Sequence, residues 1–517
     1  MRREARMKYL AKILFSRAAL LVIALVFQLT LLIGVIVKFQ QYFVIFYVIS
    51  MAISLAAVLW IVNNNINPAY KIAWIITILI FPFFGGLFYF VFGGNRLSKN
   101  TKQKMNSIDT KTRETLIPQK PVIEEMAELN ETAAKQSAYI QNYSFYPPYG
   151  DTCSEYLPTG EAKFERLKEE LKKAERFIFL EYFIIGEGIM WDSILEILKD
   201  KVRQGVEVRV IYDDFGCIMT LPYGYDKKLE EIGIRCGVFN PMIPLLSPRI
   251  NNRDHRKIAV IDGCTGFTGG INLADEYINV YERFGHWKDT AIMVKGEAVW
   301  NFTVMFLSMW DYIKRTGEDF SKYSFICPSG GCSESDGFIQ PYADSPLDNE
   351  AVCETVYSNL INKANRYVYI MTPYLIIDYE MLKALTSAAK SGVDIRIITP
   401  HKPDKWYVHE VTKSFYKPLI ESGVKIYEYT PGFIHAKTFV SDDSFGVVGT
   451  INMDYRSLYF HFECGVWMYA SSSVMDLKED FLSTQEKCHE ITIQDVKKVP
   501  WMKALLGAVL RVFAPIM

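Results

Sequence analysis

The sequence has almost no net charge. Its 57 lysines and arginines are offset by 58 aspartates and glutamates, which leaves a formal charge of −1 over 517 residues. Proteins that bind nucleic acid usually concentrate a surplus of basic residues on the binding surface. The near neutrality therefore argues against a nuclease or another nucleic-acid-binding protein, and we expect no nucleic acid among the partners.

Cysteine is present, but not in a pattern typical of a disulfide framework or a metal site. The chain has nine cysteines, an odd number, and no C-x-x-C pair. This usage is typical of reduced thiols in the cytosol. No dense carboxylate group and no Cys/His group with the spacing of metal ligands occurs. We therefore expect no metal and no cofactor.

Histidine is scarce, and two of the seven histidines occupy the same place in a long repeat. The pattern H-x-K-x4-D occurs twice, 180 residues apart, and each copy is followed seven residues after its aspartate by a second matching element, G-G-I-N or G-T-I-N. A single H-x-K would carry little information, whereas a duplicated composite motif is specific. The first copy contains His255, Lys257, Asp262 and Asn272, and the second contains His435, Lys437, Asp442 and Asn452.

The residue types of the repeat indicate phosphate chemistry. Polar and apolar positions alternate, as in a strand, so the histidine and lysine of one copy share a face. Two copies side by side bring two ammonium groups and two amides to one small space, which suits a tetrahedral oxyanion. Two imidazoles can divide the work, one as nucleophile and one as general acid and then base. The two aspartates complete the predicted catalytic set with the histidines and lysines, and within it they are expected to brace the loop after each strand and not to act on substrate.

The duplicated motif resembles that of the phospholipase D superfamily. The resemblance implies a covalent phospho-histidine intermediate and ping-pong transfer of a phosphatidyl group. It assigns the nucleophile to His255 and the acid/base to His435. A later carboxylate usually holds each ring, and the candidates are Asp289, 34 residues after His255, and Glu463, 28 residues after His435. The residues expected to bind the phosphate are Asn272, Asn452 and Thr450.

Three positions depart from the usual family pattern. The second copy has Thr450 where serine is more common, which keeps the hydroxyl. The first copy has Gly270 at the equivalent position, so only one half offers that hydroxyl. His461 stands where asparagine is more common, two residues before the supporting Glu463. None of these changes removes a catalytic group, but His461 can alter the charge near Glu463.

Residues 1–96 are predicted to be a membrane region of two or three hydrophobic helices. Three apolar runs, at about 18–37, 42–62 and 72–92, approach the ~20 residues needed to cross a bilayer. Basic clusters precede the first run and follow the third, and both favour the cytoplasmic side. An even number of crossings satisfies both clusters, which leaves open which run does not span.

Strands and helices alternate after residue 151, which predicts an α/β sandwich. The sequence QGVEVRVI at 204–211 recurs as SGVDIRII at 391–398, so the body is expected to be a gene duplication with the site between two lobes. The predicted order is a connector at 97–150, a first lobe at 151–325, a linker at 326–347, a second lobe at 348–495 and a basic amphipathic tail at 496–517. The tail suits either an anionic lipid surface or a position against the body.

The N-terminal block and several stretches of both lobes are similar to bacterial cardiolipin synthases. Among them are YLPTGEAK at 156–163, NRDHRK at 252–257 and GTINMDYR at 449–456. This resemblance implies a multi-pass protein of the bacterial cell membrane, with its lobes in the cytoplasm, that joins two phosphatidylglycerols into cardiolipin and releases glycerol. The alternatives are a phospholipase D, a phosphatidyltransferase that uses serine or another head group, or an inactive lipid-binding protein, which the intact motifs argue against. The sequence indicates no oligomeric state.

Overall fold

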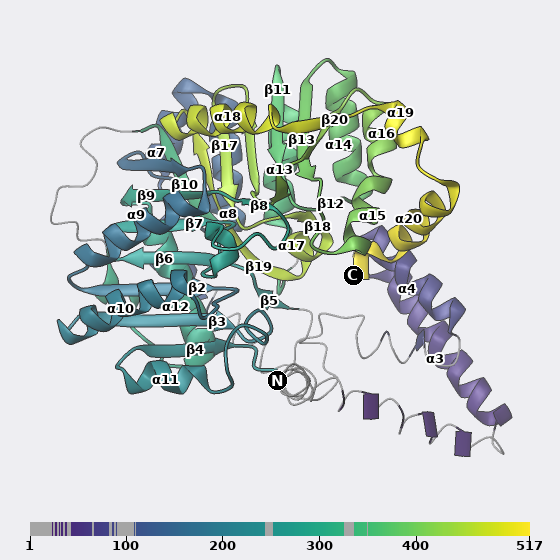
Figure 1. Ribbon diagram of the computed structural model, residues 1–517, viewed down its shortest axis with the longest axis horizontal. Coiled ribbons are helices and arrows are strands. Elements are labelled where there is room, and N and C mark those ends of the chain that lie inside the picture. Colours follow the sequence, from purple (N-terminus) through teal and green to yellow (C-terminus); the bar gives the residue numbers. More distant parts are fainter. Residues whose placement is uncertain are drawn as a thin grey trace, which may run out of the picture.

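The computed structural model describes residues 43–64, 67–81, 110–242, 252–324, 336–348 and 350–516, with a few isolated positions before residue 109. Two α/β lobes lie against each other, and helices α3 (Phe43–Asn63) and α4 (Pro68–Ile80) project from the side of the second lobe (Figure 1). The predicted α/β class and internal duplication are confirmed.

The described part of the first lobe is built on a seven-stranded sheet in the order β1-β9-β7-β6-β2-β3-β4. Strand β2 has the sequence FIFLEY and is buried along its whole length, as expected for an interior strand rich in aromatic and branched residues. It pairs parallel with β3 and antiparallel with β6. The strands are β1 (Thr152–Leu157), β2 (Phe177–Tyr182), β3 (Glu207–Asp213), β4 (Arg235–Phe239), β6 (Lys257–Ile261), β7 (Thr265–Gly269) and β9 (Ala291–Gly296).

The second lobe repeats this order as β10-β19-β17-β16-β11-β13-β14, and β20 extends its edge. Each strand has the same neighbours and relative directions as its counterpart, so the duplication seen in the sequence extends to the whole sheet. The strands are β10 (Phe338–Asp344), β11 (Tyr367–Met371), β13 (Asp394–Pro400), β14 (Lys425–Tyr429), β16 (Thr438–Ser441), β17 (Phe445–Gly449), β19 (His461–Tyr469) and β20 (Cys488–Ile491).

Amphipathic helices cover the sheets. In α9 the apolar Phe164, Leu167 and Leu171 recur at helical spacing and are buried, and the Thr159 side chain caps the first turn by accepting from the Ala162 N–H at 3.1 Å. The helices of the first lobe are α9 (Gly160–Lys173), α10 (Ile189–Arg203), α11 (Tyr225–Glu231) and α12 (Val299–Lys314). Those of the second are α13 (Val352–Lys363), α14 (Tyr379–Lys390), α15 (Trp406–Ser414), α16 (Tyr416–Ile420), α17 (Tyr455–Tyr459) and α18 (Ser472–Gln485).

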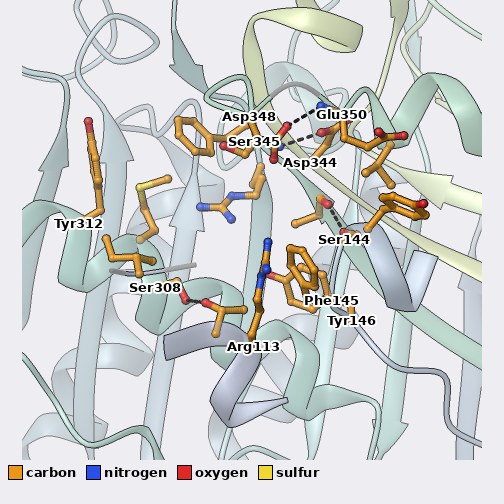
Figure 2. A pocket seen from close by; sticks show the side chains of 18 residues that line it. Arg113, Ser144, Phe145, Tyr146, Ser308, Tyr312, Asp344, Ser345, Asp348 and Glu350 are labelled. Atoms are coloured by element: carbon orange, nitrogen blue, oxygen red, sulfur yellow. Dashed lines mark hydrogen bonds between the residues drawn. The ribbon is translucent and has the colours of Figure 1, made fainter. Parts of the chain in front are cut away.

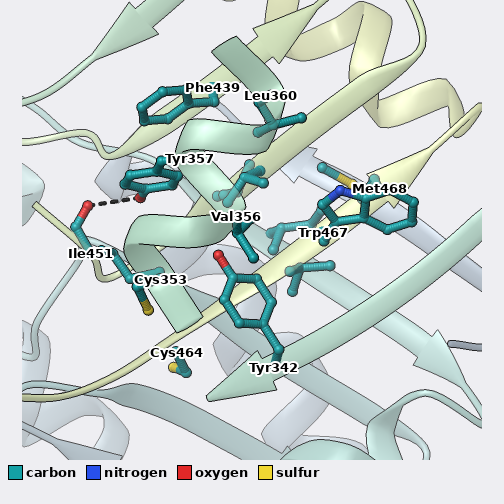
Figure 3. Packing of buried hydrophobic residues seen from close by; sticks show 14 of the residues in the cluster. Tyr342, Cys353, Val356, Tyr357, Leu360, Phe439, Ile451, Cys464, Trp467 and Met468 are labelled. Atoms are coloured by element: carbon teal, nitrogen blue, oxygen red, sulfur yellow. Dashed lines mark hydrogen bonds between the residues drawn. The ribbon is translucent and has the colours of Figure 1, made fainter. Parts of the chain in front are cut away.

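One continuous apolar core joins the two lobes. In the second lobe Tyr357 stacks on Phe439 with ring centroids 4.0 Å apart, and its hydroxyl donates to the Ile451 carbonyl at 2.9 Å (Figure 3). In the first lobe Phe179 stacks on Phe306 of α12 at 4.5 Å. All of these residues belong to the same buried cluster, so the lobes pack against each other as parts of a single body.

The predicted connector and the predicted linker both contain regular secondary structure. The connector contains α7 (Lys120–Leu129) and α8 (Glu131–Tyr143), and the Tyr146 and Tyr149 side chains that follow are buried in the body. The Tyr149 N–H donates to the Ile339 carbonyl at 3.0 Å. Residues 338–344 form strand β10 of the second sheet, whereas residues 326–335 of the predicted linker lie outside the described residues.

The predicted membrane region is only partly described. The first apolar run and the end of the third lie mostly outside the described residues. Among the helices that the structure does describe, none meets the combined length and hydropathy needed to span a bilayer. The expected transmembrane helices are therefore not shown.

Two further expectations concern the cysteines and the tail. Cys153 is disulfide-bonded, so the expectation that every cysteine is reduced is wrong, whereas buried cysteines such as Cys217 and Cys464 are thiols. The tail forms α19 (Ile493–Lys497) and α20 (Trp501–Phe513), and α20 packs one side on the body. There the Arg511 guanidinium lies 3.9 Å from the centroid of the Phe415 ring.

Candidate active site at the junction of the two lobes

Two short pairs of parallel strands join the lobes at the site, and in each pair one strand comes from each lobe. Strand β5 (Arg253–Asp254) of the first lobe pairs with the start of β19 in the second. Strand β15 (Gly432–Ile434) of the second lobe pairs with β8 (His286–Lys288) of the first. Each ladder ends immediately before a motif histidine, so each histidine is positioned by the backbone of the opposite lobe.

One residue beyond each strand pair, a histidine of one lobe lies beside a carboxylate of the other lobe. His255 follows the pair Asp254–Phe462, and its N–H donates to the Phe462 carbonyl at 3.0 Å. Its ring Nδ1 lies 2.9 and 3.0 Å from the two carboxylate oxygens of Glu463. Parallel register therefore explains why this ring meets a carboxylate from the other half of the chain.

The second histidine has the mirror arrangement. The His435 N–H donates to the Lys288 carbonyl at 2.7 Å, and its Nδ1 lies 2.7 Å from an Asp289 oxygen. The predicted supporting residues are therefore brought to the histidines, but each supports the ring of the other lobe and not the one that precedes it in sequence. This crossed pairing corrects the expected assignment within each half.

The two motif lysines lie beside the rings. The Lys257 ammonium donates to the His255 carbonyl at 2.6 Å, and Lys437 makes the equivalent bond to the His435 carbonyl. Both lysines act electrostatically on both histidines, and His435 acts on His255. The expected gathering of two imidazoles and two ammonium groups into one space is therefore present in the structure.

Burial sets the protonation of these groups. It lowers the pKa of His255 and of His435 well below the ordinary value, and the nearby lysine charges lower both further. Burial also lowers the pKa of Lys257 to about 8 and that of Lys437 to about 7, although neighbouring carboxylates oppose the shift. At neutral pH both imidazoles are uncharged, and each has a lone pair for attack or for proton transfer.

The motif aspartates serve the backbone. The Asp262 carboxylate accepts the N–H groups of Glu175, Arg176 and Phe177 at 2.7–2.9 Å, at the start of β2. Asp442 accepts those of residues 365–367 at the start of β11 in the same way. Both lie at the far end of the strand from the histidine, so their placement in the catalytic set is corrected to the bracing role.

The expected phosphate ligands are largely bonded to protein. The Thr450 hydroxyl donates to Glu463, and Asn272 accepts the Ile184 N–H at 3.0 Å and donates to the Tyr277 hydroxyl at 2.6 Å. These two residues therefore hold the frame of the site. Asn452 is buried, and its Oδ1 has no hydrogen-bond partner among the described residues, so it stays a candidate phosphate ligand.

Gly270 explains why the first copy lacks the hydroxyl. A Cβ atom at this position would lie 2.0 Å from the nearer carboxylate oxygen of Asp289. The close approach of that carboxylate to His435 therefore requires glycine. In the second copy the supporting carboxylate is Glu463, whose longer side chain leaves room for Thr450. The two halves therefore support their partner histidines in different ways.

Two groups beside the site lie outside the repeated motif. Lys405, before α15, lowers the pKa of both histidines by its charge, and it lies 5.6 Å from the centroid of the Tyr374 ring. His461, at the start of β19, has its ring centroid 5.5 Å from that of His255. Neither residue belongs to the repeat, and only the departure at His461 is visible in the sequence.

A separate cavity of about 240 Å³ is lined by residues of both lobes (Figure 2). It is lined by Arg256 and Phe462, the neighbours of His255 and Glu463, and by Arg113, which stacks on Phe145 at 3.8 Å. Because adjacent residues of an extended chain point to opposite sides, this cavity is on the other face from the reacting rings.

Comparison with known proteins identifies the family. The profile described as "Cardiolipin synthase, PLD-like domain" matches residues 167–310 and 357–484, one segment in each lobe. A second profile, "Phospholipase_D-nuclease N-terminal", matches residues 52–94. The chain belongs to the phospholipase D-like cardiolipin synthase family. It is accordingly an enzyme of the phosphatidyltransferase type.

Family relatives extend over nearly the whole chain. A cardiolipin synthase of Halalkalibacterium halodurans is 33% identical over 463 residues, which is 88% of this chain and 90% of the relative. One from Geobacillus kaustophilus is 34% identical over 455 residues, 88% of this chain and 90% of the relative. An uncharacterized protein of Streptococcus mutans is 44% identical over 472 residues, 90% of this chain and all of the relative.

A solved structure supports the fold. The phosphatidylserine synthase of Haemophilus influenzae superposes with a TM-score of 0.57 at 14% identity, over 74% of this chain and 97% of that one. At this identity the likeness concerns the fold alone. The family members and this structure therefore agree on a phospholipase D-like architecture.

Proposed function

We propose that the protein joins two phosphatidylglycerol molecules into cardiolipin and releases glycerol. The observation that carries the proposal is the crossed pair of buried histidines, each held by a carboxylate of the other lobe and flanked by both motif lysines. The cardiolipin synthase relatives support this choice of substrate. Its specific steps follow from the residues.

The first half of the reaction forms a phosphatidyl-enzyme at His255. A carboxylate only accepts hydrogen bonds, so the His255 Nδ1–H donates to Glu463 and leaves the Nε2 lone pair free to attack phosphorus. The Nε2–P bond forms as the P–O bond to glycerol breaks. The phosphate charge favours protonated His435, which gives its proton to the leaving oxygen.

The second half reverses the direction of proton transfer. His435 takes the proton from a hydroxyl of the second phosphatidylglycerol, and that oxygen displaces Nε2 from phosphorus. Lys257 and Lys437 neutralise the phosphate throughout. Since water competes as acceptor, productive transfer depends on the burial of the site, in which His255 and His435 are 8% and 7% exposed.

The N-terminal region is the proposed membrane attachment. Helix α3 exposes large apolar side chains along its length, including Val44, Leu55 and Leu59, and it projects away from the lobes (Figure 1). Contact with a bilayer removes such side chains from water. We propose that this region keeps the protein at the bacterial cell membrane with the lobes in the cytoplasm, where both lipid substrates are concentrated.

A product assay tests the proposed reaction. Purified full-length protein is incubated with phosphatidylglycerol and a chelator, and the lipids and free glycerol are quantified. We expect cardiolipin and glycerol in equal amounts, and a loss of at least a hundredfold in His255→Ala and in His435→Ala. Phosphatidic acid as the main product makes water the acceptor and overturns the proposal. A new lipid formed only with added serine or another alcohol also overturns it.

A further inference from the structure

His461 is an imidazole with buried ring nitrogens beside the proposed nucleophile. Its side chain is 10% exposed, and its Nδ1 lies 3.7 Å from a Glu463 oxygen, too far for a hydrogen bond. Neither of its ring nitrogens has a hydrogen-bond partner among the described residues. Buried polar groups are normally paired, so this ring has unused capacity to bind a ligand.

The atoms around His461 form a set of metal donors. One nitrogen each from His255 and His461 and one Glu463 oxygen all lie within 4.8 Å of one another. The His255 Nδ1 to Glu463 distance is 2.9 Å and the His461 Nδ1 to Glu463 distance is 3.7 Å. Neighbouring ligands of a tetrahedral zinc ion, at bond lengths of about 2.0–2.1 Å, are roughly 3.3 Å apart. The two separations from Glu463 lie on either side of that value, and the two ring nitrogens lie within 4.8 Å of each other.

We propose that His255, His461 and Glu463 form a binding site for a zinc ion that inhibits the enzyme. The inhibition rests on the proposed function, whereas the binding does not. Two imidazoles and one carboxylate match the three protein ligands of many zinc sites and leave a fourth position for water. Magnesium and calcium prefer sites made of oxygen ligands, so the donor set selects against them.

The nitrogen donors of His255 and His461 suit this group to zinc. The other described group of candidate ligands, Glu354, Asp378 and Glu380, is entirely acidic and offers no nitrogen.

Zinc at this site removes the nucleophile. In the active tautomer the single ring proton of His255 is on Nδ1 and is donated to Glu463, and the lone pair is on Nε2. Zinc binds the Nδ1 lone pair, so the proton of the neutral ring moves to Nε2. An Nε2–H cannot attack phosphorus. Zinc also takes the Glu463 oxygen that orients the ring, so binding and phosphatidyl transfer exclude each other.

A binding measurement tests the site without relying on activity. Zinc is titrated into detergent-solubilised full-length protein in competition with a chromogenic chelator. The variants are His461→Asn, with His461→Gln as a second replacement, and the control His489→Asn, whose imidazole is 58% exposed on β20. We expect one zinc equivalent per chain to be lost in both His461 variants and kept in the control. Retention of that equivalent in folded His461→Asn overturns the proposed site.

Rate measurements test the inhibition. With free zinc at ten times the dissociation constant, about one-eleventh of the wild-type molecules stay unoccupied, so the rate of phosphatidyl transfer is expected to fall about tenfold. The His461→Asn rate is expected to be unaffected by zinc, and magnesium is expected to have no effect on either protein. Zinc that binds without slowing the wild type overturns the inhibition. If the wild type binds zinc through His461 but transfers no phosphatidyl group, the proposed function fails and the site stands.

Discussion

At the scale of single residues, the charge of the two motif lysines depends on pH. Lys437 has a pKa lowered to about 7 by burial and Lys257 one lowered to about 8, and only the protonated forms attract phosphate. Their contribution is complete at lower pH and is lost as the pH rises through these values. We therefore predict that kcat/KM for phosphatidylglycerol falls between about pH 7 and 9.

Replacement of one lysine tests whether the loss of lysine charge causes this fall in kcat/KM. In Lys437→Arg the guanidinium keeps its charge throughout the range. The absolute rate is expected to fall, since the geometry changes, but the decline above pH 7 becomes shallower and starts at higher pH. A pH–rate profile with the same decline in both proteins would show that another group causes it.

Among the site residues, the histidines could be predicted from the sequence, whereas the partners of several other residues could not. Duplication identifies His255 and His435 because their residue types and spacing repeat. The roles of Thr450 and Asn272 escape prediction, since their partners, Glu463 and the Ile184 N–H, are set by the fold. Spacing alone is also compatible with a carboxylate that supports the histidine of its own half, so only the ladders between the lobes reveal the crossed pairing.

At the scale of elements, each motif aspartate holds the start of a central strand, β2 or β11. Asp262 receives three backbone N–H groups before and within β2, so we predict that Asp262→Ala lowers the free energy of unfolding by about 2–3 kcal/mol. Denaturant unfolding measures the change. The control is Asp200→Ala, an exposed carboxylate on α10, which is expected to change stability by less than about 0.5 kcal/mol.

The kcat of Asp262→Ala shows whether the aspartate only stabilises the fold or also takes part in catalysis. If Asp262 only braces the fold, folded Asp262→Ala keeps kcat within a few-fold of the wild type. A loss of more than a hundredfold in kcat with unchanged stability would return the aspartate to the catalytic set.

Element boundaries were predictable where the pattern was strong. The helix α9 and the strand β2 follow from their apolar spacing. The Ser/Gly/Pro-rich composition of residues 321–346 predicts a linker where strand β10 is found. It forms nonetheless, since all of its residues are buried and it pairs along its whole length with β19. Tertiary packing there overrides local preference.

At the scale of the whole molecule, duplication has produced two complete sheets but one shared site. His255 receives its carboxylate from the second lobe, and His435 receives one from the first. A continuous core fixes the lobes to each other, which keeps both crossed pairs in register. The activity is therefore expected to belong to the assembled chain and not to either half.

The most direct test of this account is to locate the covalent intermediate. A phosphatidyl donor with a p-nitrophenol leaving group needs no general acid, so it can react when His435 is absent. After quenching and digestion, mass spectrometry finds the modified residue in the wild type and in both histidine variants. The account predicts that His435→Ala accumulates the phosphatidyl group on His255 and that His255→Ala gives no adduct. An adduct on His435, or unimpaired labelling of His255→Ala, would contradict it.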